Sequence, residues 1–213
     1  MSRLPDRATM VAAIIDTYNS ATIEQADAGF EWYPMARRIL NAIADECGMP
    51  FERVALALAA LSPRNPWLWN VADTYIYAHA AARGESMPTA TTYGRNQRAA
   101  WSALTDGADP WRGSALKVRE FAKAAMGDVI AVVVDVWTMR VATRGAFSTP
   151  ANDREYYEVV GAFIDAAREL GSEPATVQAI TWVVARQAGG IARPYKKGTP
   201  DAVRAIVEEA RGS

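Results

Sequence analysis

A lone aspartate at the start of a predicted helix is the residue best placed for chemistry in this sequence. Asp135 follows a run of valines and precedes a helix that carries Arg140 and Arg144, which we expect on one helix face. An aspartate at such a junction occupies an N-cap position, where its carboxylate is held close to backbone N–H groups. Two interpretations stay open: the carboxylate only caps the helix, which is the commonest role, or it stabilises positive charge that develops during a reaction.

A lysine supplies the second reactive group. Lys117 is one of four lysines in the chain and lies eighteen positions before Asp135, directly after Gly113-Ser114-Ala115-Leu116. A lysine attacks carbon as a neutral amine, a form that burial or a neighbouring cation favours. A nucleophilic Lys117 is therefore expected in a buried or cationic environment.

The spacing of these two groups resembles the helix-hairpin-helix DNA glycosylases of the endonuclease III type, the HhH-GPD superfamily. In that family a glycine-rich hairpin ends in a lysine, and a Val-Asp-Thr-His segment supplies an aspartate eighteen residues later. The segments 54–82 and 180–194 extend the resemblance to most of the chain. The resemblance implies a single all-α domain over residues 1–213, with two helical lobes and a cleft between them. It also implies that Lys117 and Asp135 share a pocket for an extruded base.

The same resemblance implies residues that contact DNA. The turn 61–66 falls where the family fills the gap left by the extruded base, although a proline-bounded turn between two helices is an equally good interpretation. For the arginines, solvated or ion-paired positions on helix surfaces are the alternative. The candidate DNA-binding residues are Arg64, Asn65, Gly113, Ser114, Arg119, Arg140 and Arg144, and the candidate base-pocket residue is Trp137.

The chain also departs from the family pattern. Ala115 replaces the second glycine of the hairpin, and its Cβ weakens the grip of the backbone on a phosphate. The cysteine-rich loop that holds an iron–sulfur cluster is missing. With these departures, the sequence resembles a phage-associated branch of the superfamily that is linked to hypermodified thymine. This branch includes α-glutamyl/putrescinyl thymine pyrophosphorylase-like enzymes and amino acid:DNA transferases.

Three functions remain open on these grounds. The first is a glycosylase or lyase that uses Lys117 and Asp135 to release a base, and that acts in DNA repair or DNA modification. The second is a bacteriophage DNA hypermodification transferase, in which the same two residues orient a nucleophile that displaces phosphate from the 5-methyl carbon of phosphorylated 5-hydroxymethyluracil. The third is a DNA-binding module without catalysis.

Composition limits the other possibilities. The chain has 213 residues, of which 50% are apolar, and a net charge of -1 that leaves room for a local basic face. With Cys47 and His79 as the single residues of their types, no Cys/His metal cluster and no internal disulfide are expected, and no cofactor is expected. The apolar stretch 55–61 is short for a membrane span. We expect a cytoplasmic monomer with DNA as its partner.

Apolar residues recur at helical spacing along most of the chain, while the β-branched run 129–136 has no strand to pair with and is expected to be a buried connector or a helix start. Glycines 48, 84, 107, 127 and 171 stand where helices should end. The expected helices are Met10–Tyr18, Ala36–Ala44, Val54–Leu61, Val71–Ala82, Asn96–Leu104, Lys117–Ala125, Tyr156–Leu170, Ala175–Ala185 and Pro200–Ala210.

Overall fold

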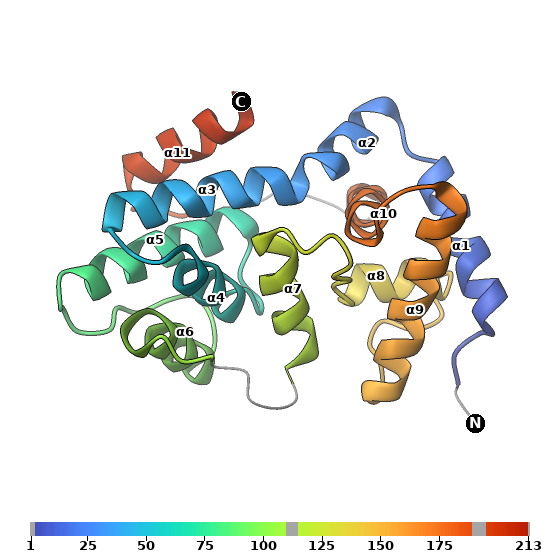
Figure 1. The fold of residues 1–213 in the computed structure, drawn as a ribbon, viewed down its shortest axis with the longest axis horizontal. Coiled ribbons are helices and arrows are strands. Elements are labelled where there is room, and N and C mark those ends of the chain that lie inside the picture. Colours follow the sequence, from blue (N-terminus) through green and yellow to red (C-terminus); the bar gives the residue numbers. More distant parts are fainter. Residues whose placement is uncertain (1–2, 110–114, 189–194, 213) are drawn as a thin grey trace. The chain divides into compact units, whose positions relative to one another are not determined.

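The chain is helical, with no β-strand, over the residues that its computed structural model describes, which are 3–109, 115–188 and 195–212. The all-α class is therefore confirmed. Each expected helix coincides with or overlaps an observed one (Figure 1). The helices are α1 Arg7–Asn19, α2 Ile23–Phe30, α3 Trp32–Cys47, α4 Phe51–Leu61, α5 Trp67–Ala82, α6 Gly94–Asp106, α7 Leu116–Met126, α8 Val136–Ala142, α9 Asp153–Leu170, α10 Pro174–Ala188 and α11 Asp201–Gly212.

The chain divides into two compact units, and each is built from two separate stretches of sequence. Unit 1 comprises residues 1–34 and 127–191, and unit 2 comprises residues 35–126 and 192–213. Unit 1 contains α1, α2, α8, α9 and α10. Unit 2 contains α4 to α7, α11 and all but the first three residues of α3.

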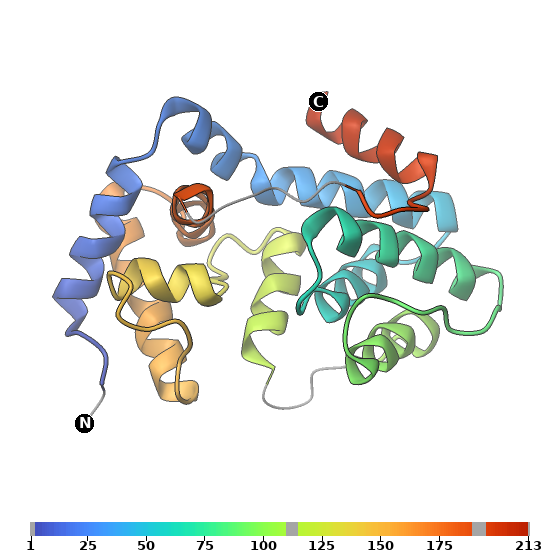
Figure 2. The same cartoon turned by 180° about the vertical axis from the view of Figure 1, so that it is seen from behind.

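Helix α10 forms the centre of unit 1. It packs against α1, α2, α8 and α9, and the end-on views in Figures 1 and 2 show α10 with α1, α8 and α9 around it. Most of its buried side chains are small: Ala175, Val177, Ala179, Thr181 and Val183 are buried, together with the larger Gln178 and Ile180. Small side chains let neighbouring helices approach closely, so α10 can pack against four helices at once.

The contact between α2 and α10 depends on a glycine. Gly29 is buried in α2, and a Cβ at this position would lie 2.4 Å from the Cα of Ile180 and 2.6 Å from its Cγ1. No real Cβ makes such a contact with a backbone atom, so the two helices can approach this closely only because residue 29 is glycine.

We expect Gly29→Ala to destabilise unit 1. The added methyl group forces α2 away from α10, and overpacking of this kind costs about 1–3 kcal/mol, more than the helix propensity of alanine returns. Urea unfolding followed by circular dichroism measures the change. The matched control is Gly161→Ala in α9, where the new Cβ meets the movable guanidinium of Arg7 and not backbone. Equal stability of the two variants would contradict the prediction.

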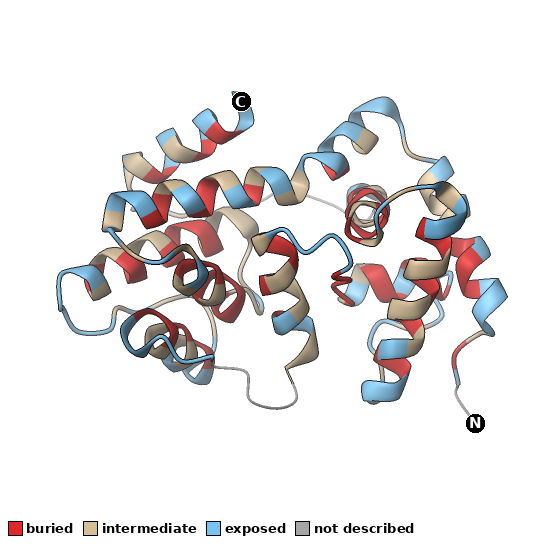
Figure 3. Ribbon diagram, in the orientation of Figure 1, coloured by how far each residue is buried: buried red, intermediate tan, exposed pale blue. Residues whose placement is uncertain are grey.

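Helix α4 forms the centre of unit 2. It packs against α5, α6 and α7, and its side chains from Ala57 to Leu61 are all fully buried. Figure 3 colours the described residues by their burial. Ile39, Leu40 and Ile43 of α3 join the same core. The apolar stretch 55–61 is thus the core helix of a globular unit, and among the described helices none has the length and apolar character needed to span a membrane.

Only the middle of the β-branched run 129–136 is a buried connector, because Val129, Ile130 and Val136 are exposed. Residues 131–134 are buried in irregular backbone, and helix α8 begins at Val136. The hydroxyl of Tyr156 accepts a hydrogen bond from the Val134 amide at 3.3 Å and donates one to the Val132 carbonyl at 3.2 Å. A tyrosine of α9 thus satisfies two buried backbone groups of the connector, a role that a neighbouring strand would have in a sheet.

Candidate functional site

Asp135 is the N-cap residue of α8, as predicted. Its Oδ1 accepts hydrogen bonds from the backbone amides of Trp137 at 2.9 Å and Thr138 at 3.0 Å. These two bonds satisfy orphan donors of the first helical turn and hold the carboxylate in one orientation. The capping role is confirmed, and a further role must come from the second oxygen.

The second oxygen of Asp135 binds a side chain from another helix. The indole Nε1 of Trp182, in α10, donates a hydrogen bond of 2.9 Å to Oδ2. The Trp182 ring lies beside Trp32, with a centroid distance of 4.8 Å, and the guanidinium carbon of Arg186 lies 4.7 Å from the Trp182 ring centroid. A half-buried carboxylate therefore stands next to aromatic rings and a cation, within unit 1.

Charge and burial act together on the groups near Asp135. Burial lowers the pKa of Arg186, and the negative charge of Asp135 opposes this shift. Burial also raises the pKa of Tyr33, and the same carboxylate raises it further, so the phenol stays neutral. Asp135 is thus the negative charge to which both neighbours respond.

A hydrogen-bonded chain beneath α8 fixes the first turn of the helix. The neutral Tyr33 hydroxyl donates to Oε1 of Gln178 at 2.7 Å, and Nε2 of Gln178 donates to the Thr138 hydroxyl at 3.2 Å. Gln178 and Thr138 are both buried. Because Thr138 is one of the two amide donors to Asp135, this chain also keeps the carboxylate in place.

The arrangement can stabilise a cation or accept a proton. An ionised carboxylate has about four acceptor positions, and three N–H groups bind Asp135. No other described residue donates to Asp135, so Oδ2 can accept one further hydrogen bond. A carboxylate held by fixed donors needs no reorganisation when positive charge develops beside it.

Trp137 and Arg140 lie one helical turn apart on α8. The guanidinium carbon of Arg140 is 5.0 Å from the Trp137 ring centroid, and Trp137 is half-buried while Arg140 is exposed. The exposed guanidinium is accessible to a phosphate, and its DNA-binding role stays a prediction, as does the base-pocket role of Trp137.

The expectation that Arg140 and Arg144 share a helix face is wrong. Helix α8 ends at Ala142, Thr143 is its C-cap, and Arg144 has a left-handed φ of 48°. The Arg144 guanidinium instead pairs with Asp16 of α1, and both side chains are exposed. The helix ends in a Schellman turn, in which the Gly145 amide donates to the Arg140 carbonyl at 2.8 Å and the Arg144 amide donates to the Val141 carbonyl at 3.3 Å.

Lys117 and Arg119 belong to unit 2, in the first turn of α7, and both are exposed. The described residues around Lys117 therefore do not provide the burial that a neutral amine requires. Gly113 and Ser114, the predicted hairpin residues, lie outside the described residues. Asp135 belongs to unit 1, and the shared pocket of Lys117 and Asp135 stays a prediction.

The structure separates the two candidates in the turn between α4 and α5. Arg64 is exposed and has a left-handed φ of 59°. Asn65 turns inward, where its Nδ2 donates a hydrogen bond of 2.9 Å to Oδ2 of Asp73. Arg64 is therefore the residue of this pair that can reach a nucleic acid.

Sequence reasoning missed the partners of Asp135 from α10. Trp182 and Arg186 are four residues apart and so share a helix face, which is a readable signal. Nothing local indicates that this face meets Asp135, which lies 47 positions away. Trp32 is separated from Asp135 by still more of the chain.

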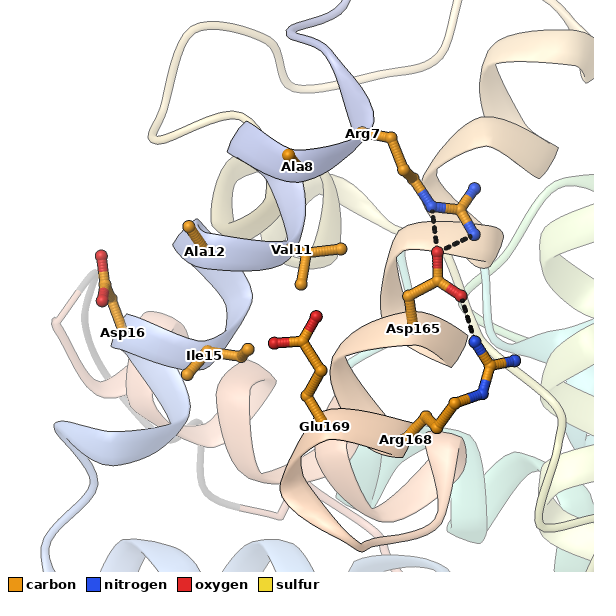
Figure 4. Close-up of a pocket in the computed structure, with 9 residues that line it drawn as sticks. All are labelled: Arg7, Ala8, Val11, Ala12, Ile15, Asp16, Asp165, Arg168 and Glu169. Carbon is orange, nitrogen blue, oxygen red and sulfur yellow. Dashed lines mark hydrogen bonds and ion pairs between the residues drawn. The ribbon is translucent and has the colours of Figure 1, made fainter.

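A groove of about 720 Å³ lies elsewhere in unit 1, between α1 and α9 (Figure 4). Its floor is apolar, and Arg7 and Arg168 both pair with Asp165 on one side of it. None of the predicted site residues lines this groove. Because the three N–H donors on its carboxylate give Asp135 a fixed orientation, we place the candidate site there and not in the groove.

The chain belongs to a family whose model matches residues 2–189 and which is described as a family of unknown function (DUF7178). No curated protein and no solved structure matches the chain.

Proposed function

We propose that this DUF7178 member is a DNA base-processing enzyme that acts on an extruded, modified base by glycosylase or lyase chemistry. Asp135 is its central catalytic residue, and Lys117 is the candidate nucleophile of the lyase form. The observation that carries the proposal is the Asp135 carboxylate, which three N–H donors hold in place and whose fourth acceptor position is not used by any described residue.

Release of a base by cleavage of the N-glycosidic bond builds positive charge on the sugar. A carboxylate close to C1′ stabilises that charge, and it can also take a proton from an attacking water. A cap alone uses one oxygen of Asp135. The indole bond of Trp182 to the other oxygen and the nearby half-buried Arg186 support a role in which the whole carboxylate is oriented.

The two forms of the proposal differ in their nucleophile. In hydrolysis, water attacks C1′ and Asp135 accepts its proton. In the lyase form, the Lys117 amine attacks C1′, the base leaves, and the resulting Schiff base leads to strand cleavage. The exposed position of Lys117 supports hydrolysis as the principal reaction, since hydrolysis needs no neutral amine.

A nucleoside assay tests the proposed function. Single- and double-stranded oligonucleotides containing thymine, uracil, 5-hydroxymethyluracil or its phosphate are incubated with the protein, digested to nucleosides and analysed by mass spectrometry. We expect loss of one of the modified bases. Conversion of the phosphorylated base to one of different mass, with release of phosphate and with the sugar bond intact, would replace this proposal with a transferase. An unchanged set of nucleosides from every substrate would reject DNA base processing.

Lysine trapping tests the lyase form. If Lys117 attacks C1′, borohydride reduces the imine and leaves a covalent protein–DNA adduct, and Lys117→Gln abolishes the adduct with little change in binding. The matched control is Lys123→Gln on the same helix, where the lysine pairs with Glu120 at 2.7 Å. Full base release by Lys117→Gln without an adduct in either protein would establish hydrolysis by Asp135 and water.

A further inference from the structure

Two exposed arginines of unit 2 lie against one exposed tyrosine, and a third exposed arginine lies close to the start of helix α6. The guanidinium carbon of Arg64 lies 5.5 Å from the ring centroid of Tyr93, and that of Arg95 lies 6.0 Å from the same centroid. Arg98 follows one turn later on α6 and extends back to the helix start, where its Nη1 would be 3.5 Å from a Cβ on Gly94. We call Arg64, Tyr93, Arg95 and Arg98 the arginine cluster.

The surroundings of the arginine cluster carry little negative charge. The two stretches that contain it, residues 53–72 and 86–105, include no aspartate or glutamate. Among the described residues, no carboxylate forms an ion pair with any of the three arginines, in contrast to the ion-paired Arg154 and Arg211. The cluster is therefore a local positive surface on a chain whose net charge is -1.

A buried carboxylate ties together the two loops that carry Arg64 and Tyr93. The side chain of Asp73 is fully buried, and its Oδ2 accepts hydrogen bonds from Nδ2 of Asn65 at 2.9 Å and from the Thr91 amide at 3.1 Å. The Thr92 hydroxyl also donates to the Pro63 carbonyl at 2.8 Å. Arg64 and Tyr93 are thus held side by side by the fold before any ligand arrives.

The conformation of Arg64 also needs an explanation. A left-handed φ is strained for a residue with a Cβ and is free of strain for glycine. A non-glycine residue in this conformation at an exposed loop tip is consistent with a functional use of its side chain.

We propose that the arginine cluster binds successive phosphates of a nucleic acid strand. The guanidinium group offers planar, paired N–H donors that match a phosphate, and the Tyr93 ring holds two of these groups apart at fixed positions. The three arginines lie spread over an exposed surface, which suits the repeated phosphates of a polymer better than one small anion. This inference rests on the proposed function, which makes DNA the substrate.

Salt dependence of binding tests the inference. We measure the affinity of the full chain for single- and double-stranded oligonucleotides over a range of salt concentrations. The slope of log K against log salt is negative, and each lost phosphate contact lowers its magnitude by about 0.7 for single strands or 0.9 for duplexes. All changes of slope below refer to this magnitude. The triple variant R64Q/R95Q/R98Q should lower the slope by about 2–3. The control R154Q/R168Q/R211Q removes the same charge from arginines that are already ion-paired and should leave the slope nearly unchanged.

Arg64→Gly separates binding from folding, because glycine adopts the left-handed φ without strain. We expect a chain that is at least as stable as the original and has a slope lowered by about 1. The inference is overturned if the triple variant keeps the original slope, or if the control variant lowers the slope by the same amount. Either result leaves base processing at Asp135 unaffected. A lowered slope in a protein that releases no base supports the arginine cluster and rejects the proposed function. An absence of DNA binding by the unaltered chain overturns both.

Discussion

Asp135→Asn is expected to lower the rate of base release by roughly 10²–10³, the loss typical when one electrostatic stabiliser is removed. Asparagine keeps an oxygen that can accept the amide hydrogen bonds of Trp137 and Thr138, so α8 should still form. What disappears is the negative charge. Single-turnover assays on the oligonucleotide that the nucleoside assay identifies measure the change.

The same substitution has a structural cost that can be separated from its effect on catalysis. With the asparagine oxygen at the amides, its NH₂ group faces the Trp182 indole, and two donors oppose each other. A part-buried donor without an acceptor costs about 1–3 kcal/mol. Adding Trp182→Phe removes the opposing donor, so the double variant should regain stability without regaining activity. If the double variant regained both stability and activity, or if Asp135→Asn alone were fully active, Asp135 would be only a cap.

Lys196→Met is expected to lower the free energy of unfolding by about 3–5 kcal/mol, the usual cost of breaking a buried ion pair from one side. The Lys196 ammonium contacts Oδ1 of Asp73, whose side chain is 0% exposed, while that of Lys196 is 23% exposed. Removal of the lysine leaves a buried carboxylate without its cation. Because water can reach the position of Lys196, we expect the lower end of the range.

The double variant Asp73→Asn/Lys196→Met is the control for this prediction. It removes both charges and keeps an amide oxygen that can accept from Asn65 or Thr91, so most of the lost stability should return. Urea denaturation of the two variants and the original chain measures the coupling. A Lys196→Met chain as stable as the original would mean that the Asp73–Lys196 pair contributes nothing to unit 2.

Local signals predicted most of the secondary structure. Gly107 and Gly171 stand where the sequence requires α6 and α9 to end, and both have a left-handed φ near 65°. The capping position of Asp135 was also readable, because an N-cap depends on neighbours two and three residues away. Helix α2 was missed although Thr22 and Gln25 form a capping box, because its eight residues span little more than two helical turns, which is short for recognising a helical period.

The tertiary structure alone decided which side chains meet. The sequence by itself determined an all-helical chain, the ends of most helices and a carboxylate at the start of α8, because these follow from interactions within one or two helical turns. The Trp182 bond to Asp135 spans 47 positions and the Lys196 contact with Asp73 spans 123. Such contacts depend on how helix faces pack against one another, and packing is set by the combined shape of many distant side chains that no local pattern encodes.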